Sequence, residues 1–179
     1  MRVITGSARG RKLLTPDNYD VRPTGDKVKE SVFSIIQFDI EGRRVLDLFA
    51  GTGQLGIEAL SRGARSAVFV DSSKKSLDIV KKNLKICNMD AEVYNDDACS
   101  FLRRTSGKFD LVFMDPPYDS DVYEPALDLI CGIDLLNENG IIVCESHSDR
   151  TMPELQGFKS KLYRYGKTKI TVYKKDTAI

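Results

Sequence analysis

A four-residue motif, Asp115-Pro116-Pro117-Tyr118, follows an apolar run over residues 109–114 that is typical of a strand buried on both faces. Because each proline lacks an N–H and has a fixed φ, the strand must end at Asp115. A carboxylate, the Pro116 carbonyl and an aromatic ring therefore meet at a strand end. The two acceptors suit an amino group and the ring suits a planar base. The motif predicts a site for a nucleobase with an exocyclic amine, although a strand-ending turn alone would also contain such residues.

A glycine-rich segment, Gly51-Thr52-Gly53-Gln54-Leu55-Gly56, matches the G-x-G-x-x-G pattern between an expected strand and an expected helix. Its glycines allow a tight turn and a close approach of a ligand to the backbone. Asp71 lies 20 residues after Gly51, at the end of the next expected strand, where a carboxylate accepts hydrogen bonds from ribose hydroxyls. The segment therefore predicts a site for a cofactor that contains a nucleoside.

Acidic residues distinguish a dinucleotide from S-adenosylmethionine. Asp47 lies within the apolar strand that leads into the glycine segment, where it would repel a pyrophosphate at the helix N-terminus but attract a sulfonium or an α-amino group. It could also accept hydrogen bonds from the N–H groups of the glycine segment. After the third strand, Asp97 offers an acceptor for the adenine amine and Ala98 offers a backbone N–H. These residues favour S-adenosylmethionine.

The hydrophobic periodicity predicts an α/β fold with a mostly parallel sheet, helices on both faces and an antiparallel C-terminal hairpin. A short basic hairpin is expected over residues 2–15, and a helix is expected from Thr24, its possible N-cap, with Gly42 ending that element. A turn is expected over residues 137–140. The expected strands are 45–49, 66–70, 91–94, 109–114, 141–144, 158–165 and 168–173, and the other expected helices are 55–62, 73–88, 98–104 and 121–130.

The composition is that of a soluble globular protein, with 179 residues, 41% hydrophobic and 30% charged. We expect one domain, with a basic arm over residues 1–23 and a catalytic core over residues 24–179. Neither a membrane span nor a signal-peptide core is visible, so a cytoplasmic protein is expected. His147, the single histidine, is interpreted as a polar loop residue without a partner, and no metal is expected. The cysteines are expected to be buried free thiols: Cys87, Cys99, Cys131 and Cys144.

The net charge is only +1, but the basic residues gather at the two ends of the chain. Residues 1–12 and residues 159–175 each contain several lysines and arginines and no acidic residue. Such segments are suited to hold a polyanion beside a site. For the C-terminal run, a solvated surface is the favoured interpretation.

Several segments resemble known families. Residues 45–53 resemble the first motif of class I S-adenosylmethionine-dependent methyltransferases, and residues 115–118 resemble their amino-methyltransferase signature. The segments that carry Arg2 to Gly6, Arg9 to Leu13, Arg22 to Thr24 and Gly56 to Ala64 are similar to the RsmD-type family. That resemblance covers nearly the whole chain and implies methylation of the N2 amine of a specific guanine in small-subunit (16S) ribosomal RNA. The chain departs from the pattern mildly, at Gly25, Lys27 and Asp71.

The resemblance also implies roles for individual residues and partners. Catalysis is expected from Asp115, Pro116 and Tyr118, without a metal. The substrate is expected to be ribosomal RNA in a partly assembled ribosomal particle. A monomer is the default expectation and does not rest on the resemblance. The RNA-binding residues would be Arg9, Arg11, Lys12, Arg22, Thr24, Pro117 and Tyr118. The residues that hold S-adenosylmethionine, and its product S-adenosylhomocysteine, would be Asp47, Phe49, Ala50, Gly51, Gly53, Asp71, Ser72, Asp97, Ala98 and Asp115.

Three other functions remain open at this point. A DNA adenine-N6 or cytosine-N4 methyltransferase would use the same motif, although 179 residues leave little room for a target-recognition domain. A nicotinamide-dependent oxidoreductase would use the glycine segment but would leave Asp47 and Asp115 without roles. A module that binds RNA without catalysis is the third.

Overall fold

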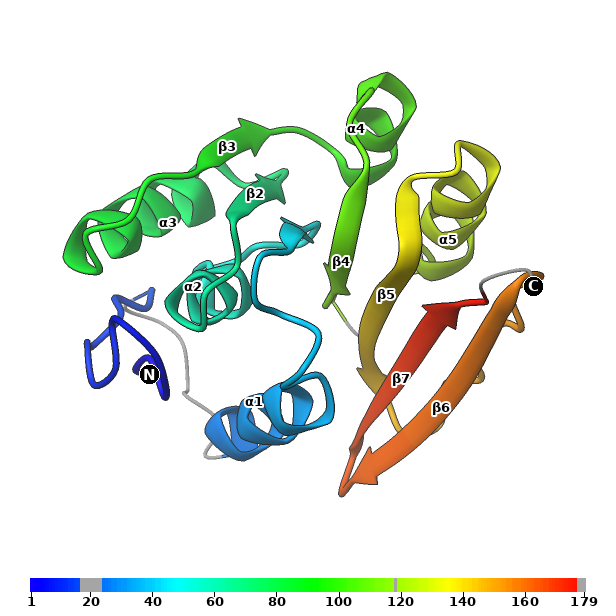
Figure 1. Cartoon of the computed structure of the whole chain (residues 1–179), viewed down its shortest axis with the longest axis horizontal. Helices are drawn as coiled ribbons and strands as arrows, with labels where there is room; N and C mark the ends of the chain where they lie inside the picture. Colours follow the sequence, from blue (N-terminus) through cyan, green and yellow to red (C-terminus); the bar gives the residue numbers. More distant parts are fainter. Residues whose placement is uncertain (17–23, 118, 177–179) are drawn as a thin grey trace.

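The computed structural model describes residues 1–16, 24–117 and 119–176, and for Thr24 it describes the backbone alone. It contains an open sheet with helices on both faces (Figure 1). The elements follow in chain order as α1 (Thr24–Ile35), β1 (Arg44–Asp47), α2 (Gln54–Ser61), β2 (Ser66–Asp71), α3 (Lys74–Ile86), β3 (Glu92–Asn95), α4 (Ala98–Arg104), β4 (Phe109–Met114), α5 (Tyr123–Gly132), β5 (Leu136–His147), β6 (Phe158–Tyr165) and β7 (Thr168–Lys175).

The seven strands lie in the order β3-β2-β1-β4-β5-β7-β6. The first five in that order are parallel, and β7 runs antiparallel to both β5 and β6. The strand order reverses between β1 and β4, which are neighbours although α2, α3 and α4 separate them in the chain. In open α/β sheets ligands bind at such a reversal, outside the carboxyl ends of the strands. The predicted fold class is confirmed, and the topology directs attention to the ends of β1 and β4.

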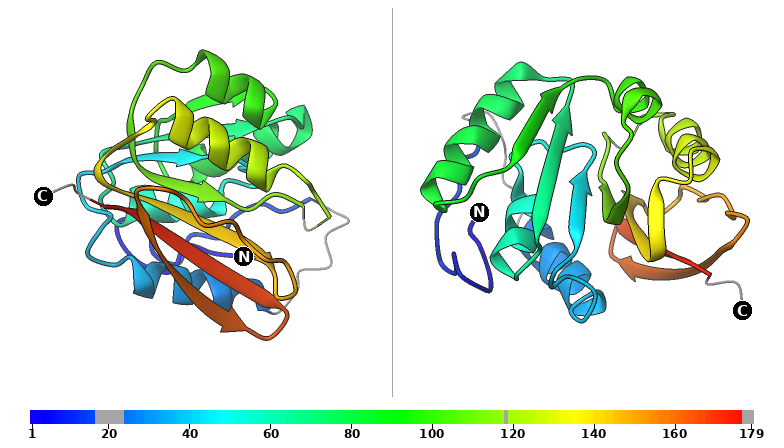
Figure 2. Two further views of the ribbon diagram at one scale, coloured as in Figure 1. Left: turned by 90° about the vertical axis from the view of Figure 1, so that its right-hand side faces the viewer. Right: turned by 45° about the horizontal axis from the view of Figure 1, so that its top comes forward.

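Two apolar layers hold the sheet between the helices (Figure 2). On one face α1, α2 and α3 pack on side chains such as Val45 and Phe113, and on the other face α4 and α5 pack on side chains such as Leu46 and Val112. All side chains of β4 except that of Asp110 are buried, because β4 lies centrally and has helices on both sides. The apolar run that precedes Asp115 is therefore a core strand, as its composition predicts.

Polar side chains cap the starts of α3 and α4, as the preference of serine and aspartate for the N-cap position predicts. The Ser73 side chain accepts a hydrogen bond from the Ser76 N–H at 3.3 Å, which confirms its predicted cap on α3. The Asp97 side chain accepts one from the Ser100 N–H at 3.0 Å and caps α4. At α2 the capping residue is Gly53, whose φ of 80° lies in the left-handed region that glycine adopts without strain.

Two predicted boundaries are wrong. The expected turn over residues 137–140 lies inside β5, which begins at Leu136, because Leu136 pairs with Phe109 and the ladder then shifts register. The residues that signal a turn form this irregularity instead, with Asn139 at φ 58°. Helix α1 ends at Ile35, well before Gly42. Among the described residues no helix is long and apolar enough to cross a membrane.

Candidate active site

Carboxylates from four strands gather along the carboxyl edge of the sheet. Asp47 ends β1 and Asp71 ends β2, while Asp97 and Asp115 closely follow β3 and β4. Because these strands are parallel, their ends meet at one edge. The reversal of strand order makes β1 and β4 neighbours, so Asp47 and Asp115 belong to adjacent strand ends. Residues predicted for cofactor and substrate therefore share one edge.

The glycine segment forms a turn whose backbone N–H groups donate hydrogen bonds to neighbouring carboxylates. Gly51 has a φ of 54°, and its N–H donates to Asp71 Oδ2 at 2.8 Å. The other Asp71 oxygen accepts from the Ser73 N–H at 2.8 Å. A Cβ added at Gly51 would meet nothing within 4 Å, whereas one at Gly56 would lie 2.4 Å from the Phe69 ring. The backbone at Gly51 is thus open to a ligand, while Gly56 lets α2 pack closely on the sheet.

Asp47 is fully buried beneath this turn. Its Oδ2 accepts a hydrogen bond from the Gly56 N–H at 3.0 Å, which confirms the role in holding the loop. Burial raises the pKa of Asp47 to about 7; the Gly56 hydrogen bond counteracts this rise, and the charge on Asp71 adds to it. A cationic ligand group above Asp47 would favour the ionised form. The residues present therefore fit a cofactor that carries a sulfonium and an α-amino group, and they do not fit a pyrophosphate.

Asp115 lies at the end of β4 beside a second acid that the sequence analysis did not single out. Met114 pairs with Cys144 in the parallel ladder, so Asp115 and Glu145 follow as neighbours on adjacent strands. Burial raises the pKa of Asp115 well above its ordinary value, and the negative charges on Glu145 and Asp47 raise it further. A signal for Glu145 was present in the sequence, because it follows the apolar run of β5 as Asp115 follows that of β4.

The turn after Asp115 is fastened to the neighbouring segments. Pro116 is buried and Pro117 is exposed, while Tyr118 lies outside the described residues. The Ser120 N–H donates to the Pro117 carbonyl at 2.9 Å. The Arg150 guanidinium donates to the Ser120 carbonyl at 2.9 Å and lies 4.7 Å from the centre of the Tyr123 ring. Nothing local in the sequence indicated this role of the Arg150 side chain, because Ser120 and Tyr123 are 30 and 27 positions away in the chain.

The remaining cofactor residues occupy the same edge. Phe49 and Ala50 precede the glycine turn, and the Ala50 N–H donates to the Val70 carbonyl at 2.9 Å. The exposed Ser72 follows Asp71. Asp97 keeps the α4 cap described above, and Ala98 begins that helix in a buried position. Because each carboxylate oxygen accepts more than one hydrogen bond, the cap leaves Asp97 able to accept another.

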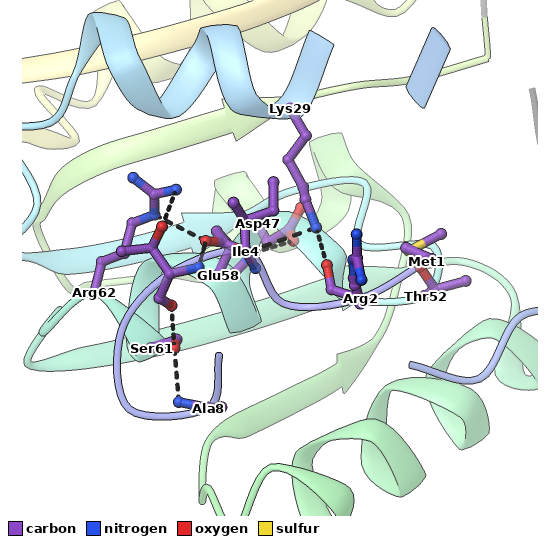
Figure 3. Close-up of polar contacts among 12 residues, drawn as sticks. Met1, Arg2, Ile4, Ala8, Lys29, Asp47, Thr52, Glu58, Ser61 and Arg62 are labelled. Atoms are coloured by element: carbon purple, nitrogen blue, oxygen red, sulfur yellow. Dashed lines mark hydrogen bonds and ion pairs between the residues drawn. The ribbon is translucent and has the colours of Figure 1, made fainter. Parts of the chain in front are cut away.

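The N-terminal arm, here residues 1–16, is joined to the core by a buried carboxylate (Figure 3). The arm contains one β-bridge, between Arg2 and Lys12, rather than extended strands. Glu58 of α2 is fully buried, and its two oxygens accept from the Ile4 N–H at 2.8 Å and the Thr5 N–H at 3.0 Å. Because two arm N–H groups depend on one buried side chain, the arm is part of the folded core.

Two cations complete the cluster around Glu58 (Figure 3). Lys29 Nζ lies 3.5 Å from Glu58 Oε2 and donates to the Arg2 carbonyl at 2.7 Å, and Arg62 Nε donates to Glu58 Oε1 at 2.8 Å. Burial lowers the pKa of Lys29, and Glu58 counteracts that effect. The charges are thus paired within a desolvated cluster that fixes the arm between α1 and α2.

The predicted RNA-binding residues divide into two groups. Arg9, Arg11 and Lys12 are exposed on the arm. Arg22 lies outside the described residues, and Thr24 is described only as the first residue of α1.

The arm also reaches the cofactor turn, because the Asn83 amide of α3 donates to the Thr52 carbonyl at 2.9 Å and accepts from the Leu14 N–H at 2.7 Å.

Two predictions about single residues are tested by these contacts. His147 is the last residue of β5 rather than a loop residue, and its Nδ1 lies 3.4 Å from both the Asp149 N–H nitrogen and a carboxylate oxygen of Asp149. The expectation that it lacks a partner is therefore wrong. Two of the four free cysteines are buried, and two are half-buried. Within the described part of the chain, no group of three acidic, histidine or cysteine side chains is arranged to hold a metal ion.

Comparisons with known proteins identify the family of the chain. The family model described as conserved hypothetical protein 95 matches residues 1–174. "Putative rRNA methyltransferase YlbH" of Bacillus subtilis is 43% identical and aligns over 98% of this chain and 99% of its own length. "Ribosomal RNA small subunit methyltransferase D" of Haemophilus influenzae is 39% identical over 85% of this chain and 81% of its own. The solved structure "Putative methyltransferase yhhF from Escherichia coli" has a TM-score of 0.88 and 32% identity, and covers 99% of both chains. The chain therefore belongs to the RsmD-type family, with the fold of the class I S-adenosylmethionine-dependent methyltransferases.

Proposed function

We propose that this protein transfers a methyl group from S-adenosylmethionine to the exocyclic N2 amine of a guanine in small-subunit ribosomal RNA. The observation that carries the proposal is the pair of strand ends at the reversal of the sheet, where Asp47 underlies the glycine turn and Asp115 precedes two prolines. The names of the relatives support the RNA substrate. The Asp115-Pro116-Pro117-Tyr118 motif and the family resemblance support the N2 amine as the methylated atom.

The cofactor would lie along the carboxyl edge from β1 to β3. Asp71 would accept hydrogen bonds from the ribose, the turn at Gly51 and Gly53 would lie against the cofactor, and Asp97 and Ala98 would bind the adenine. Asp47 would stabilise the cationic end from beneath. When bound, the cofactor supplies an electrophilic methyl group on a sulfonium. Phe49, Ala50 and Ser72 would complete this surface.

The base would enter beside Asp115. Its carboxylate and the Pro116 carbonyl would accept hydrogen bonds from the amine, whose lone pair is otherwise delocalised into the ring. These acceptors would stabilise the positive charge that develops on the nitrogen as the new N–CH₃ bond forms and the old S–CH₃ bond breaks. The nitrogen then loses one proton. Asp115 has a raised pKa and is therefore a suitable acceptor for that proton.

The RNA would be held outside this pocket. We place Arg9, Arg11 and Lys12 of the arm, with Arg22 and Thr24, against phosphates, and we place Pro117 and Tyr118 against the base. A paired guanine would have to leave its stack to reach Asp115. A partly assembled ribosomal particle in the cytoplasm is the proposed substrate, with the protein acting as a monomer.

Transfer of labelled methyl from S-adenosylmethionine tests the proposal directly. Unmethylated small-subunit particles, naked ribosomal RNA and DNA would serve as acceptors, each digested to nucleosides after the reaction. We expect the label in N2-methylguanosine of the ribosomal RNA. Label in methylated adenine or cytosine of DNA would support Asp115 as the amine-binding site but would contradict ribosomal RNA as the substrate. Absence of label, with S-adenosylhomocysteine still raising the melting temperature, would reject catalysis on these substrates.

A further inference from the structure

Six of the seven basic residues of the β6–β7 hairpin lie near one of its two ends, and Lys161 lies between them. Thr168, the first residue of β7, pairs with both Tyr165 of β6 and His147 at the end of β5. The turn between β6 and β7 therefore lies at the carboxyl edge of the sheet, on the same edge as Asp115. The opposite end of the hairpin, where Lys159 pairs with Lys174, lies at the amino edge.

At the amino edge the cations are paired with acidic residues. Three lysines there form ion pairs: Lys159 with Asp176 at 2.9 Å, Lys174 with Asp39 at 3.7 Å, and Lys175 with Asp134 at 2.5 Å. Asp39 and Asp134 also pair with Arg43 and Lys108, so the carboxylates neutralise the lysines only in part, and this end of the hairpin attracts a polyanion less than unpaired cations would.

At the carboxyl edge the cations gather without such neutralisation. Arg164, Lys167 and Lys169 form no ion pair with a carboxylate among the described residues. Arg164 instead donates to the Ser148 carbonyl at 3.1 Å. Lys169 is only 3% exposed, and burial lowers its pKa, with Arg164 and Arg150 lowering it further and Asp149 opposing them. Several positive charges thus converge at this turn, which costs free energy that an anion would return.

The surface that carries these charges is ordered by backbone contacts. The Ser148 N–H donates to the Lys167 carbonyl at 2.9 Å, which ties the loop after β5 to the hairpin turn. Arg150 of the same loop joins it to the turn after Asp115, as described above. A hollow there is lined by Asp119, which follows the Asp115 turn, and by His147, Arg150 and Thr151, at the end of β5 and in the loop after it. The charged turn is therefore connected to the proposed base pocket by fixed contacts.

We propose that the turn end of the β6–β7 hairpin, with the loop over residues 148–150, is a second surface that binds phosphates of the substrate RNA. The N-terminal arm and this hairpin lie on either side of α1 (Figure 1). RNA held by both surfaces would span the carboxyl edge, and the strand between the two contacts would present its base to Asp115. This inference rests on the proposed function, because it assigns a contact for the same substrate.

Charge reversal at Lys167 tests the surface, with the same change at Lys159 as the matched control. Both lysines are exposed and lie on one hairpin, so Lys167→Glu and Lys159→Glu change the net charge equally. The readouts are KM for the RNA acceptor that the wild-type protein methylates and its dependence on salt. We expect Lys167→Glu to raise KM about tenfold and to reduce the slope of log KM against log salt by about 0.7–0.9. Lys159→Glu should change both values little.

The outcomes separate this inference from the proposed function. Equal effects of Lys167→Glu and Lys159→Glu, in variants that melt as the wild type does and bind S-adenosylhomocysteine equally, would reject the second surface while the enzyme remained active. Absence of methyl transfer by the wild-type protein would instead reject the proposed function. If Lys167→Glu weakened methylation of particles but not of naked RNA that the wild type methylates, an acidic protein surface would replace the phosphates as the partner, and the proposal would fail.

Discussion

Asp47 and Asp115 end adjacent strands at the reversal of the sheet, yet their surroundings differ. Asp47 is 2% exposed and accepts a hydrogen bond from the Gly56 N–H, so it is part of the scaffold beneath the glycine turn. Asp115 is half-buried and neighbours Glu145, with a proline turn after it. Burial raises the pKa of both carboxyl groups. The difference fits the proposed roles, in which Asp47 supports the cofactor site and Asp115 binds the reacting amine.

Exchanging each carboxylate for an amide tests this division most strongly. Asp115→Asn should lower kcat by about 100- to 1,000-fold, because the amide keeps only one acceptor oxygen and lacks the negative charge that stabilises the positive charge developing on the amine. Asp47→Asn should weaken cofactor binding by about tenfold or more through loss of a buried charge, with kcat at saturating cofactor largely retained. Steady-state kinetics with varied cofactor would distinguish the two. Equal kcat losses in both variants would contradict separate roles.

The raised pKa of Asp47 also predicts how stability depends on pH. Between the pKa of an unfolded aspartate and about 7, the folded protein binds more protons at Asp47 than the unfolded chain does. The free energy of unfolding should therefore fall as pH rises from about 4 to 7, by on the order of 4 kcal/mol from this group. Denaturant titrations across this range should show a shallower fall for Asp47→Asn. If stability fell equally with pH in the wild type and in Asp47→Asn, the extra proton of the folded state would be bound by a group other than Asp47.

Gly56, whose N–H donates to Asp47, supports this carboxylate from α2. A Cβ at Gly56 would lie 2.4 Å from the Phe69 ring and 3.2 Å from Asp47 Oδ2, so Gly56→Ala should lower the free energy of unfolding by about 1–3 kcal/mol. It should also weaken cofactor binding. Gly132→Ala is a matched control, because a Cβ there meets nothing within 4 Å. Thermal melts and cofactor titrations of both variants measure the effect, and a stable Gly56→Ala with normal cofactor affinity would contradict it.

The smallest expected effect concerns the acid beside Asp115. Glu145 raises the pKa of Asp115 through its negative charge, so Glu145→Gln should lower that pKa. Activity that requires ionised Asp115 should then extend to lower pH, with the acidic limb of the kcat profile moving in that direction. Asp128→Asn in α5 is the control, because Asp128 does not contribute to the raised pKa of Asp115, and it should leave the limb in place. An unmoved limb in Glu145→Gln would separate Glu145 from the chemistry.

The fold was predictable where local signals agree with tertiary packing. The bounds of β4 and α4 match the expected ranges, because prolines end the strand and Asp97 caps the helix. The start of β5 was missed because Asn137 to Gly140 signal a turn locally, while pairing with β4 keeps them in the ladder. Local sequence does not contain that pairing.

The site was predictable at the level of motifs. The structure brings Asp47, Asp71 and Asp115 to one edge because they end parallel strands, which the alternating pattern already indicated. Their individual roles stay predictions, as do those of Tyr118 and Arg22. Glu58 and Arg150 show what a motif cannot reveal. Glu58 binds backbone groups more than 50 positions away in the chain, and Arg150 fastens a turn 30 positions away.

The attachment of the arm to Glu58 has a consequence for how the protein can be shortened. Removal of residues 1–14 would leave the Glu58 carboxylate without two N–H partners and would expose the cluster that it forms with Lys29 and Arg62. The Thr52 carbonyl and Asn83 would lose their link to Leu14 as well. A basic arm at a chain end resembles a separable extension, but this arm is packed between α1 and α2 as part of the fold. A truncated chain would lose the basic residues that we propose bind RNA, together with contacts that support the proposed cofactor site.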